Sequence, residues 1–145
     1  MEIITKNAQE THDAGFRVGS SLKGSEVIFL KGELGAGKTT FVQGLSEGLG
    51  IEHTITSPTF ILMRSYSLPE KKDRTAKTLY HVDLYRLEHD VDREAQNLGI
   101  FDLWTKPESV FVIEWADRLN TLPSGILEVS LEVIDIDTRK ITITP

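Results

Sequence analysis

The sequence contains no cysteine, which excludes disulfide bonds, thiolate metal sites and cysteine nucleophiles. It also contains no apolar run that approaches the roughly 20 residues needed to span a membrane. The N-terminal segment lacks the basic and then apolar order of a signal peptide. From these absences we expect a cytoplasmic protein that does not contact membranes.

Basic residues are fewer than acidic ones. Sixteen Lys and Arg residues against 22 Asp and Glu residues give the chain a net charge of −6. A protein that binds nucleic acid by itself usually carries a basic surface that displaces the counterions of the phosphates. A stand-alone RNA-binding protein is therefore the least favoured class. If the protein acts on RNA, we expect a partner to make most of the contacts with the RNA.

The composition is otherwise typical of a globular domain. The 145 residues are 39% hydrophobic and 26% charged, and they contain no internal repeat or low-complexity tract. A chain of this length buries roughly two-thirds of its unfolded surface, which is enough for a core without disulfides. We expect one domain spanning residues 1–145.

The N-terminal half alternates between patterns typical of strands and of helices. A short strand is predicted at Glu2–Thr5, and a continuous apolar strand, of the kind covered on both faces, at Glu26–Lys31. A helix that ends before Gly50 is predicted at Lys38–Leu49, and it is the second helix of the chain. The first helix is predicted from small and apolar residues at steps of three and four, namely Ala8, Thr11, Ala14, Gly15, Val18 and Leu22.

The C-terminal half adds further strands. Leu127–Val133 alternates apolar and polar residues, as a half-solvated antiparallel strand does, and Ile141 and Ile143 indicate its partner strand. The pattern predicts an α/β fold with a mainly parallel central sheet, antiparallel edge strands and flanking helices. The other predicted elements are strands at Thr59–Ser67, Thr78–Asp83 and Ser109–Trp115, a polar loop or hairpin tip at Pro69–Lys77, and a helix at Val91–Leu98 closed by Gly99.

One segment carries a nucleotide-binding motif. The residues from Gly32 to Thr39 read Gly-Glu-Leu-Gly-Ala-Gly-Lys-Thr, a full match to G-x-x-x-x-G-K-[ST]. The glycines allow backbone N–H groups to turn inward around phosphate oxygens. Lys38 would place a positive charge at the β- and γ-phosphates, and the Thr39 hydroxyl would ligate Mg²⁺. The helix that begins here adds its positive end, with Thr40 in the first turn.

The context of the motif supports a phosphate-binding loop and a P-loop NTPase-like fold. A chance match in a chain of this length is on the order of one in a few hundred. A buried strand before the motif and a helix after it meet the motif's structural requirement, which disfavours a glycine-rich turn that binds nothing. The residues expected to contact the nucleotide through this loop are Glu33, Leu34, Gly35, Ala36, Gly37, Lys38, Thr39 and Thr40.

Two carboxylates are placed to complete such a site. Asp83 and Glu114 follow apolar strands, and ligands bind in the crevice outside the carboxyl ends of parallel strands. P-loop enzymes use a carboxylate there to organise Mg²⁺ and water. Other roles stay open, because Asp83 could cap the next turn and Glu114 could pair with a basic residue. Trp115 could cover the nucleotide or belong to the core, and His81 is expected to pack structurally.

The class of P-loop protein can be narrowed further. Neither N-K-x-D nor D-x-x-G, the guanine and switch motifs of GTPases, is present, which favours ATP over GTP. Small-molecule kinases share the loop but generally carry a lid and an arginine-rich acceptor pocket. The loop Pro69–Lys77 contains only Arg74, which is weak support for a kinase.

The chain resembles the TsaE family, formerly YjeE, of bacterial P-loop ATPases required for threonylcarbamoyl modification of the tRNA adenosine beside the anticodon. The similarity extends from about the first helix to the C-terminal strands, and four blocks in family order are more specific than the P-loop alone. The matching blocks are Gly32–Phe41, Thr56–Phe60, His81–Leu87 and Val112–Ala116.

The resemblance implies roles for individual residues. The segment Thr56–Phe60 corresponds to a mobile, switch-like loop near the γ-phosphate, and Asp83 lies in a second switch-like block. The residues that the resemblance places around the ligands are Thr11 near the base, Trp115 beside the nucleotide, and Thr39 with Glu114 around Mg²⁺.

By the same resemblance, the protein neither makes nor transfers the threonylcarbamoyl group. It binds the TsaD–TsaB pair, meets tRNA through that complex, and resets the complex with its ATP cycle. We expect a Mg²⁺-dependent ATPase, slow alone and faster with its partners, in which Lys38, Asp83 and Glu114 are catalytic. The alternatives are a small-molecule kinase and a nucleotide-gated binding module without turnover. Leu68–Thr78 is longer and more charged than a compact member needs, which predicts a hairpin insertion.

Overall fold

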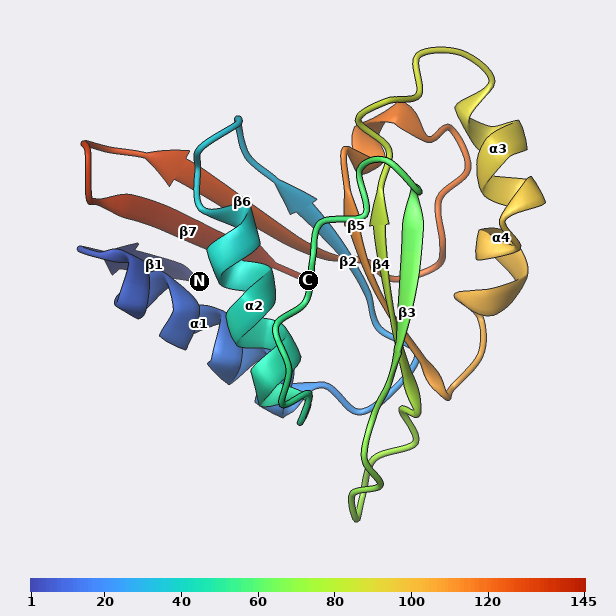
Figure 1. Ribbon diagram of the computed structural model, residues 1–145, viewed down its shortest axis with the longest axis horizontal. Helices are drawn as coiled ribbons and strands as arrows, with labels where there is room; N and C mark the ends of the chain where they lie inside the picture. Colours follow the sequence, from blue (N-terminus) through green and yellow to red (C-terminus); the bar gives the residue numbers. More distant parts are fainter.

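Four parallel strands form the centre of the sheet. In the computed structural model, which describes residues 1–145, β2 (Val27–Lys31), β5 (Ser109–Glu114) and β4 (Thr78–Asp83) lie side by side and run parallel. On the other side of β2, β6 (Leu127–Val133) is also parallel. Every residue of β5 is buried, as expected for a strand covered on both faces. The predicted α/β fold with a mainly parallel centre is confirmed (Figure 1).

The edges of the sheet are antiparallel. The strand order is β1-β7-β6-β2-β5-β4-β3, in which β1 (Glu2–Thr5), β7 (Arg139–Thr144) and β3 (Met63–Ser67) pair antiparallel with their neighbours. The prediction that residues 127–133 form an antiparallel strand holds for the pairing with β7 and is wrong for the pairing with β2. Alternating hydrophobicity reports which face of a strand is buried, and it does not report the direction of each neighbouring strand.

The predicted strand Thr59–Ser67 begins too early. Strand β3 starts at Met63, and the residues before it form a turn in which the N–H groups of Ile61 and Leu62 both donate to the carbonyl of Pro58. Leu62 adopts a φ of 69°, which no strand residue has. In the sequence, the apolar residues of this turn resemble those of a strand. Phe60 is 84% exposed and lies beside the cleft described below.

Two helices cover each face of the sheet (Figure 1). On one face lie α1 (Ala8–Ser21) and α2 (Lys38–Gly48), and on the other lie α3 (Val91–Asn97) and α4 (Ile100–Leu103). The predicted helix at residues 91–98 corresponds to α3, and α4 was not predicted. Gly99, at a φ of 79°, separates these two short helices.

The strand β2 shows how the two cores are filled. Ile28 and Leu30 point toward α1 and α2, whereas Val27 and Phe29 belong to the cluster beneath α3 and α4. All four side chains are almost completely buried. The continuous apolar run therefore serves two cores, one on each face, and it holds the loop that follows β2 at a defined edge of the sheet.

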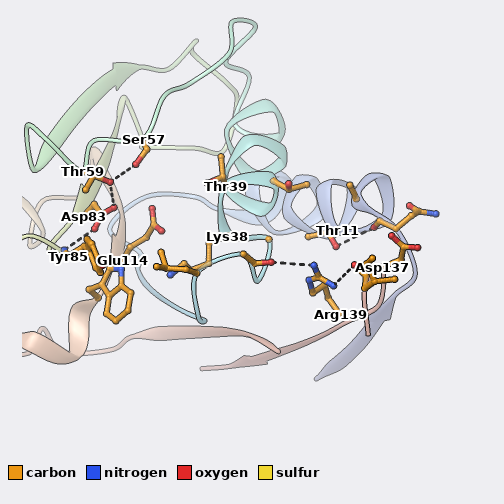
Figure 2. Close-up of a pocket in the computed structure, with 18 of the residues that line it drawn as sticks. Thr11, Lys38, Thr39, Ser57, Thr59, Asp83, Tyr85, Glu114, Asp137 and Arg139 are labelled. Atoms are coloured by element: carbon orange, nitrogen blue, oxygen red, sulfur yellow. Dashed lines mark hydrogen bonds between the residues drawn. The ribbon is translucent and has the colours of Figure 1, made fainter. Parts of the chain in front are cut away.

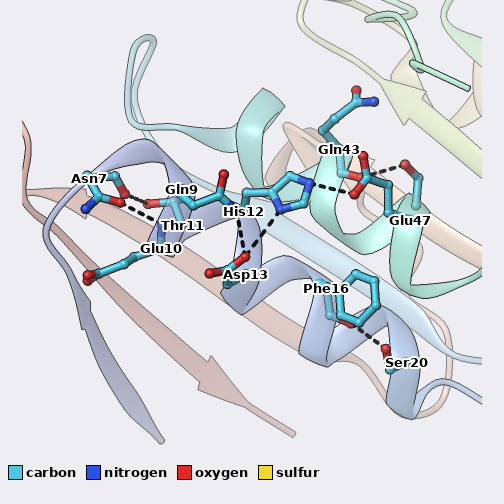
Figure 3. A network of polar contacts seen from close by, with 11 residues as sticks. Asn7, Gln9, Glu10, Thr11, His12, Asp13, Phe16, Ser20, Gln43 and Glu47 are labelled. Atoms are coloured by element: carbon cyan, nitrogen blue, oxygen red, sulfur yellow. Dashed lines mark hydrogen bonds and ion pairs between the residues drawn. The ribbon is translucent and has the colours of Figure 1, made fainter. Parts of the chain in front are cut away.

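The helices α1 and α2 approach each other through glycines. A Cβ atom added to Gly44 of α2 would lie 1.9 Å from the carbonyl oxygen of His12, and one added to Gly15 of α1 would lie 2.1 Å from that of Phe41. Beside this contact, His12 Nε2 lies 2.9 Å from Glu47 Oε2 and links the two helices (Figure 3). The start of α2 is thereby held against α1 by backbone contact.

The hairpin tip between β3 and β4 lies far from the carboxyl ends of the parallel strands (Figure 1). It is polar, as predicted for Pro69–Lys77, and Arg74 Nη1 donates to the carbonyl of Leu49 at 2.9 Å. The tip is therefore tied to the end of α2 that is remote from the glycine-rich loop. None of the helices has the length and the apolar character that crossing a membrane requires.

Candidate nucleotide-binding site

The glycine-rich loop joins β2 to the start of α2. Gly35 and Gly37 adopt φ values of 81° and 98°, a region that glycine enters without strain. Ala36 N–H donates to the carbonyl of Glu33 at 3.0 Å, which closes the loop on itself. The backbone N–H groups from Gly37 to Thr40 have no acceptor within the chain. These free donors at a helix N-terminus form an anion-binding surface.

The side chain of Lys38 lies across the mouth of this loop. Its Nζ donates to the carbonyl of Gly32 at 2.6 Å and lies 4.7 Å from the centre of the Trp115 ring. The residue is 8% exposed, and no carboxylate forms an ion pair with it. A buried ammonium without a carboxylate partner favours a bound anion.

The two predicted carboxylates lie beside each other. Asp83 and Glu114 are aligned neighbours at the ends of the parallel strands β4 and β5, and both are buried. Asp83 Oδ1 accepts from the N–H of Tyr85 at 2.9 Å, so it does cap the next turn. Asp83 Oδ2 accepts from the Thr59 hydroxyl at 2.7 Å. Since both carboxylates also line the cleft, capping and a functional role are compatible.

His81 has a closer connection to this site than the sequence indicated. Its Nε2 lies 2.7 Å from Glu114 Oε2, and both residues are buried. Its Nδ1 is buried without a hydrogen-bond partner. Glu114 therefore does pair with a basic residue, and that residue is His81. The alternation of His81 with Asp83 along β4 was the available signal, but the partner strand was not known from the sequence.

A cleft of about 610 Å³ connects these groups (Figure 2). Figure 2 shows Asp83 and Glu114 toward one end, Thr11 and Arg139 toward the other, and Lys38 between them. The segment 56–60 contributes to the same cleft through Ser57, Thr59 and Phe60. The predicted site residues that line the cleft are Thr11, Leu34, Gly35, Gly37, Lys38, Thr39, Thr40, Asp83, Glu114 and Trp115.

Three predicted contacts are placed differently from the rest. Ala36 is 1% exposed, and Glu33 lines a smaller hollow next to the cleft, so neither side chain lines the cleft itself. Thr11 does line it, but its hydroxyl lies 2.7 Å from that of Thr5 and is already hydrogen-bonded.

Trp115 lines the cleft and also packs against the core cluster beneath α3 and α4, so both roles considered from the sequence apply. It follows Glu114 in the left-handed region, at a φ of 61°, and precedes the short 3₁₀ helix η1 (Ala116–Arg118). Its ring centre lies 5.1 Å from that of Tyr85, and the Arg118 guanidinium lies 5.3 Å from it. Trp115 therefore stands between two cations, Lys38 and Arg118, at the edge of the cleft.

The sequence did not predict most of the residues that line the end of the cleft away from Asp83 and Glu114. This far end is lined by Asn7 and Ala8 at the start of α1 and by Ile136, Asp137 and Arg139 around the β6–β7 turn. These residues come from the two ends of the chain and carry no motif. The N–H of Asp137, together with Thr138, donates to the carboxylate of the adjacent Asp135 and lowers the pKa of that group below its ordinary value of 3.8.

Comparison with known proteins identifies the family of the chain. The model of the family described as "Threonylcarbamoyl adenosine biosynthesis protein TsaE" matches residues 5–141. The chain belongs to the TsaE family. The TsaE protein of Treponema pallidum is 38% identical over 99% of each chain. That of Bacillus subtilis is 36% identical over 97% of this chain and 82% of its own. The resemblance found in the sequence is confirmed.

A solved structure supports the same assignment. The crystal structure of YdiB from Bacillus subtilis superposes with a TM-score of 0.75 at 30% identity, covering 99% of this chain and 83% of that one. The P-loop NTPase-like fold expected for a TsaE protein is therefore confirmed.

The residues of this TsaE chain fit a magnesium nucleotide. The free N–H groups from Gly37 to Thr40 and the ammonium of Lys38 offer donors to phosphate oxygens. The Thr39 hydroxyl and the Glu114 carboxylate line the same cleft and supply oxygen ligands of the kind that Mg²⁺ prefers.

Proposed function

We propose that this protein is a Mg²⁺-dependent ATPase that supports threonylcarbamoyl modification of the tRNA adenosine beside the anticodon. The observation that carries the proposal is that one cleft contains the free N–H groups of the P-loop, Lys38, Thr39 and the carboxylates Asp83 and Glu114. The family and its relatives are named for threonylcarbamoyladenosine biosynthesis, which supplies the pathway. A cytoplasmic location is part of the proposal.

Each group of the cleft has a distinct task in this proposal. The N–H groups from Gly37 to Thr40 and the Lys38 ammonium bind the phosphates and neutralise their charge. Thr39 and Glu114 hold Mg²⁺, which when bound withdraws charge from the β- and γ-phosphate oxygens. The Lys38 ammonium has three N–H donors and gives one of them to the carbonyl of Gly32, which leaves two for phosphate oxygens.

Asp83 is proposed to orient the attacking water or the loop that covers it. Its carboxylate holds the Thr59 hydroxyl at 2.7 Å, and Arg86 Nη1 holds the carbonyl of Phe60 at 2.5 Å. These bonds fasten the segment 56–60 to the end of β4, beside the position of the γ-phosphate in this proposal. Movement of the segment would break the bond to Asp83 and free that carboxylate.

The surface around the cleft supports partner proteins that complete the site. Leu34, Phe60 and Ile136 line the cleft and are 71%, 84% and 88% exposed. Exposed apolar side chains grouped around a polar cleft are typical of a surface that a protein covers. We propose that the TsaD–TsaB pair is this partner and accelerates hydrolysis. The acidic chain then contacts tRNA through that complex.

The placement of the hairpin tip bears on the kinase alternative. The loop Pro69–Lys77 is tied to the far end of α2 and does not line the cleft, so it is not a lid over the nucleotide. Arg74 donates to the carbonyls of Leu49 and Pro69 and is not available to an acceptor phosphate. The structure thus offers no observation that favours a small-molecule kinase.

Titration of the purified chain with ATP in the presence of Mg²⁺, followed by calorimetry, tests the proposed site. We expect saturable binding to the parent, loss of binding in Lys38→Ala, and unchanged binding in Lys106→Ala, an exposed lysine remote from the cleft. Glu114→Gln should keep most of the affinity for ATP and lose the contribution of Mg²⁺. Equal binding by the parent and Lys38→Ala would contradict the proposed site.

A further inference from the structure

Arg139, the first residue of β7, reaches the phosphate-binding loop from the opposite end of the chain. Its Nε donates to the carbonyl of Ala36 at 3.1 Å, and its Nη2 donates to the carbonyl of Gly35 at 3.3 Å. Figure 2 shows where Arg139 lies in the cleft. Both acceptors lie in the loop whose glycines precede α2. The sheet order β1-β7-β6-β2, with β7 two strands away from β2, makes this reach possible.

The same guanidinium also holds the turn between β6 and β7. Its Nη1 donates to the carbonyls of Asp135 at 2.9 Å, Thr138 at 3.1 Å and Ile136 at 3.3 Å. Ile136 and Asp137 of this turn line the far end of the cleft. One side chain thus joins the phosphate-binding loop to the turn that faces it.

The geometry of the peptide group gives these bonds a consequence for phosphate binding. In a trans peptide the C=O and N–H groups point in opposite directions. With the Ala36 carbonyl directed at Arg139 Nε, the N–H of Gly37 is directed away from Arg139. That N–H is the first of the free donors that begin α2. Arg139 therefore orients the Gly37 N–H, which is one of the groups that can donate a hydrogen bond to a phosphate oxygen.

The charge of Arg139 adds to this effect. None of the ion pairs of the chain includes Arg139, and all of its hydrogen bonds go to backbone carbonyls. The residue is half-buried, so solvent screens its charge less than that of an exposed arginine. A guanidinium beside the loop makes the free N–H groups of the loop more attractive to an anion.

We propose that Arg139 is a positioning residue of the nucleotide site, which holds the phosphate-binding loop in its binding conformation and fixes the β6–β7 turn against it. The inference rests on the proposed function and assigns to this site a residue outside the P-loop motif. Arg139 acts on the ligand through the backbone of Gly35, Ala36 and Gly37, and it is not a catalytic residue.

The test compares Arg139→Met and Arg139→Lys with Lys140→Met, a substitution of the next lysine, whose side chain pairs with Glu2. Calorimetry measures the affinities for Mg-ATP and for inorganic tripolyphosphate, which has no base. We expect Arg139→Met to lower the affinity for both ligands about tenfold. Arg139→Lys should lower it less, because an ammonium keeps the positive charge but lacks the forked donors of a guanidinium. Lys140→Met should bind both ligands like the parent.

A second readout separates positioning from a general loss of stability. The backbone amide resonance of Gly37, observed by NMR without any ligand, should shift in Arg139→Met, while the resonances of α3 stay in place. If the parent binds Mg-ATP and Arg139→Met binds both ligands as tightly as the parent, the inference is overturned and the proposed function stands. Absence of Mg-ATP binding by the parent itself would overturn both. If Arg139→Met does not fold, unchanged affinities in Arg139→Lys with an unshifted Gly37 amide would overturn the inference.

Discussion

The Nε2 atom of His81 lies 2.7 Å from the Oε2 atom of Glu114, across the parallel strands β4 and β5. Both residues are buried, so the bond fixes the direction of a carboxylate that lines the cleft. One oxygen of Glu114 is occupied by the histidine, which leaves the other for Mg²⁺ in the proposed site. In the proposed site, the buried pair therefore supports the metal-binding role of Glu114.

Loss of this support should weaken Mg²⁺ binding more than nucleotide binding. Residues that orient a metal-binding side chain typically contribute about 10- to 100-fold to metal affinity or activity. We expect His81→Leu to raise the Mg²⁺ concentration needed for half-maximal phosphate release by about tenfold, with ATP affinity in EDTA unchanged. The matched control is His89→Leu, which replaces an exposed histidine. An unchanged Mg²⁺ requirement in His81→Leu would contradict the supporting role.

The bond between Thr59 and Asp83 should control the segment 56–60. Its length of 2.7 Å and its charged acceptor make it one of the stronger hydrogen bonds in the site. We expect Thr59→Val to increase amide hydrogen exchange of residues 57–62 about tenfold and to lower phosphate release, whereas Thr59→Ser keeps the hydroxyl and behaves like the parent. Equal exchange in Thr59→Val and Thr59→Ser would show that the hydroxyl does not hold the segment.

The glycine contact between α1 and α2 should be intolerant of a methyl group. A Cβ on Gly44 would lie 1.9 Å from the backbone oxygen of His12, and a backbone atom cannot move aside as a side chain can. We expect Gly44→Ala to lower the free energy of unfolding by at least about 2 kcal/mol, although alanine favours a helix over glycine. Urea unfolding measures this, with the exposed Arg17→Ala as the control on the same helix pair. A Gly44→Ala protein as stable as the parent would contradict the close approach.

The loop after η1 should become less stable in acid. The Thr121 hydroxyl, with the N–H groups of Thr121 and Asn120, lowers the pKa of Asp92 below its ordinary value of 3.8. Because the folded pKa is lower than the unfolded one, the contribution of Asp92 to stability is present above pH 3.8 and disappears as the pH falls through the folded pKa.

The variant Asp92→Asn isolates this contribution. Its stability deficit relative to the parent, measured by urea unfolding, should be constant from pH 5 to pH 7 and should shrink below about pH 4. The control is Asp102→Asn, which changes an exposed carboxylate whose side-chain oxygens accept no hydrogen bond. A deficit for Asp92→Asn that is independent of pH would contradict the assignment.

Local sequence patterns predicted those parts of the site that each depend on one short stretch of chain. The glycine-rich loop follows a buried strand, and Asp83 and Glu114 end strands whose apolar runs are long enough to be recognised. Their positions at one edge follow from the rule that parallel strands have their carboxyl ends together. These parts could be predicted because each depends on a short stretch of chain.

The other parts of the site depend on pairings between distant segments. The contact of Arg139 with the loop requires the strand order β7-β6-β2, and the bond between His81 and Glu114 requires the register of β4 against β5. Neither the order nor the register is encoded in a local pattern. The prediction of strand at residues 59–62 is wrong because a turn with apolar side chains beside the cleft has the same composition as a short strand.

The central claim is a nucleotide hydrolysis that partners accelerate at the cleft of Lys38. Phosphate release from Mg-ATP by the purified chain, alone and with increasing TsaD–TsaB pair, tests it most directly. Groups supplied in trans to P-loop enzymes can raise rates by about 10³ to 10⁵. We predict slow release alone, clear stimulation by the pair, and loss of both in Lys38→Ala but not in Lys106→Ala. Release that the pair does not change, or that Lys38→Ala retains, would contradict the account.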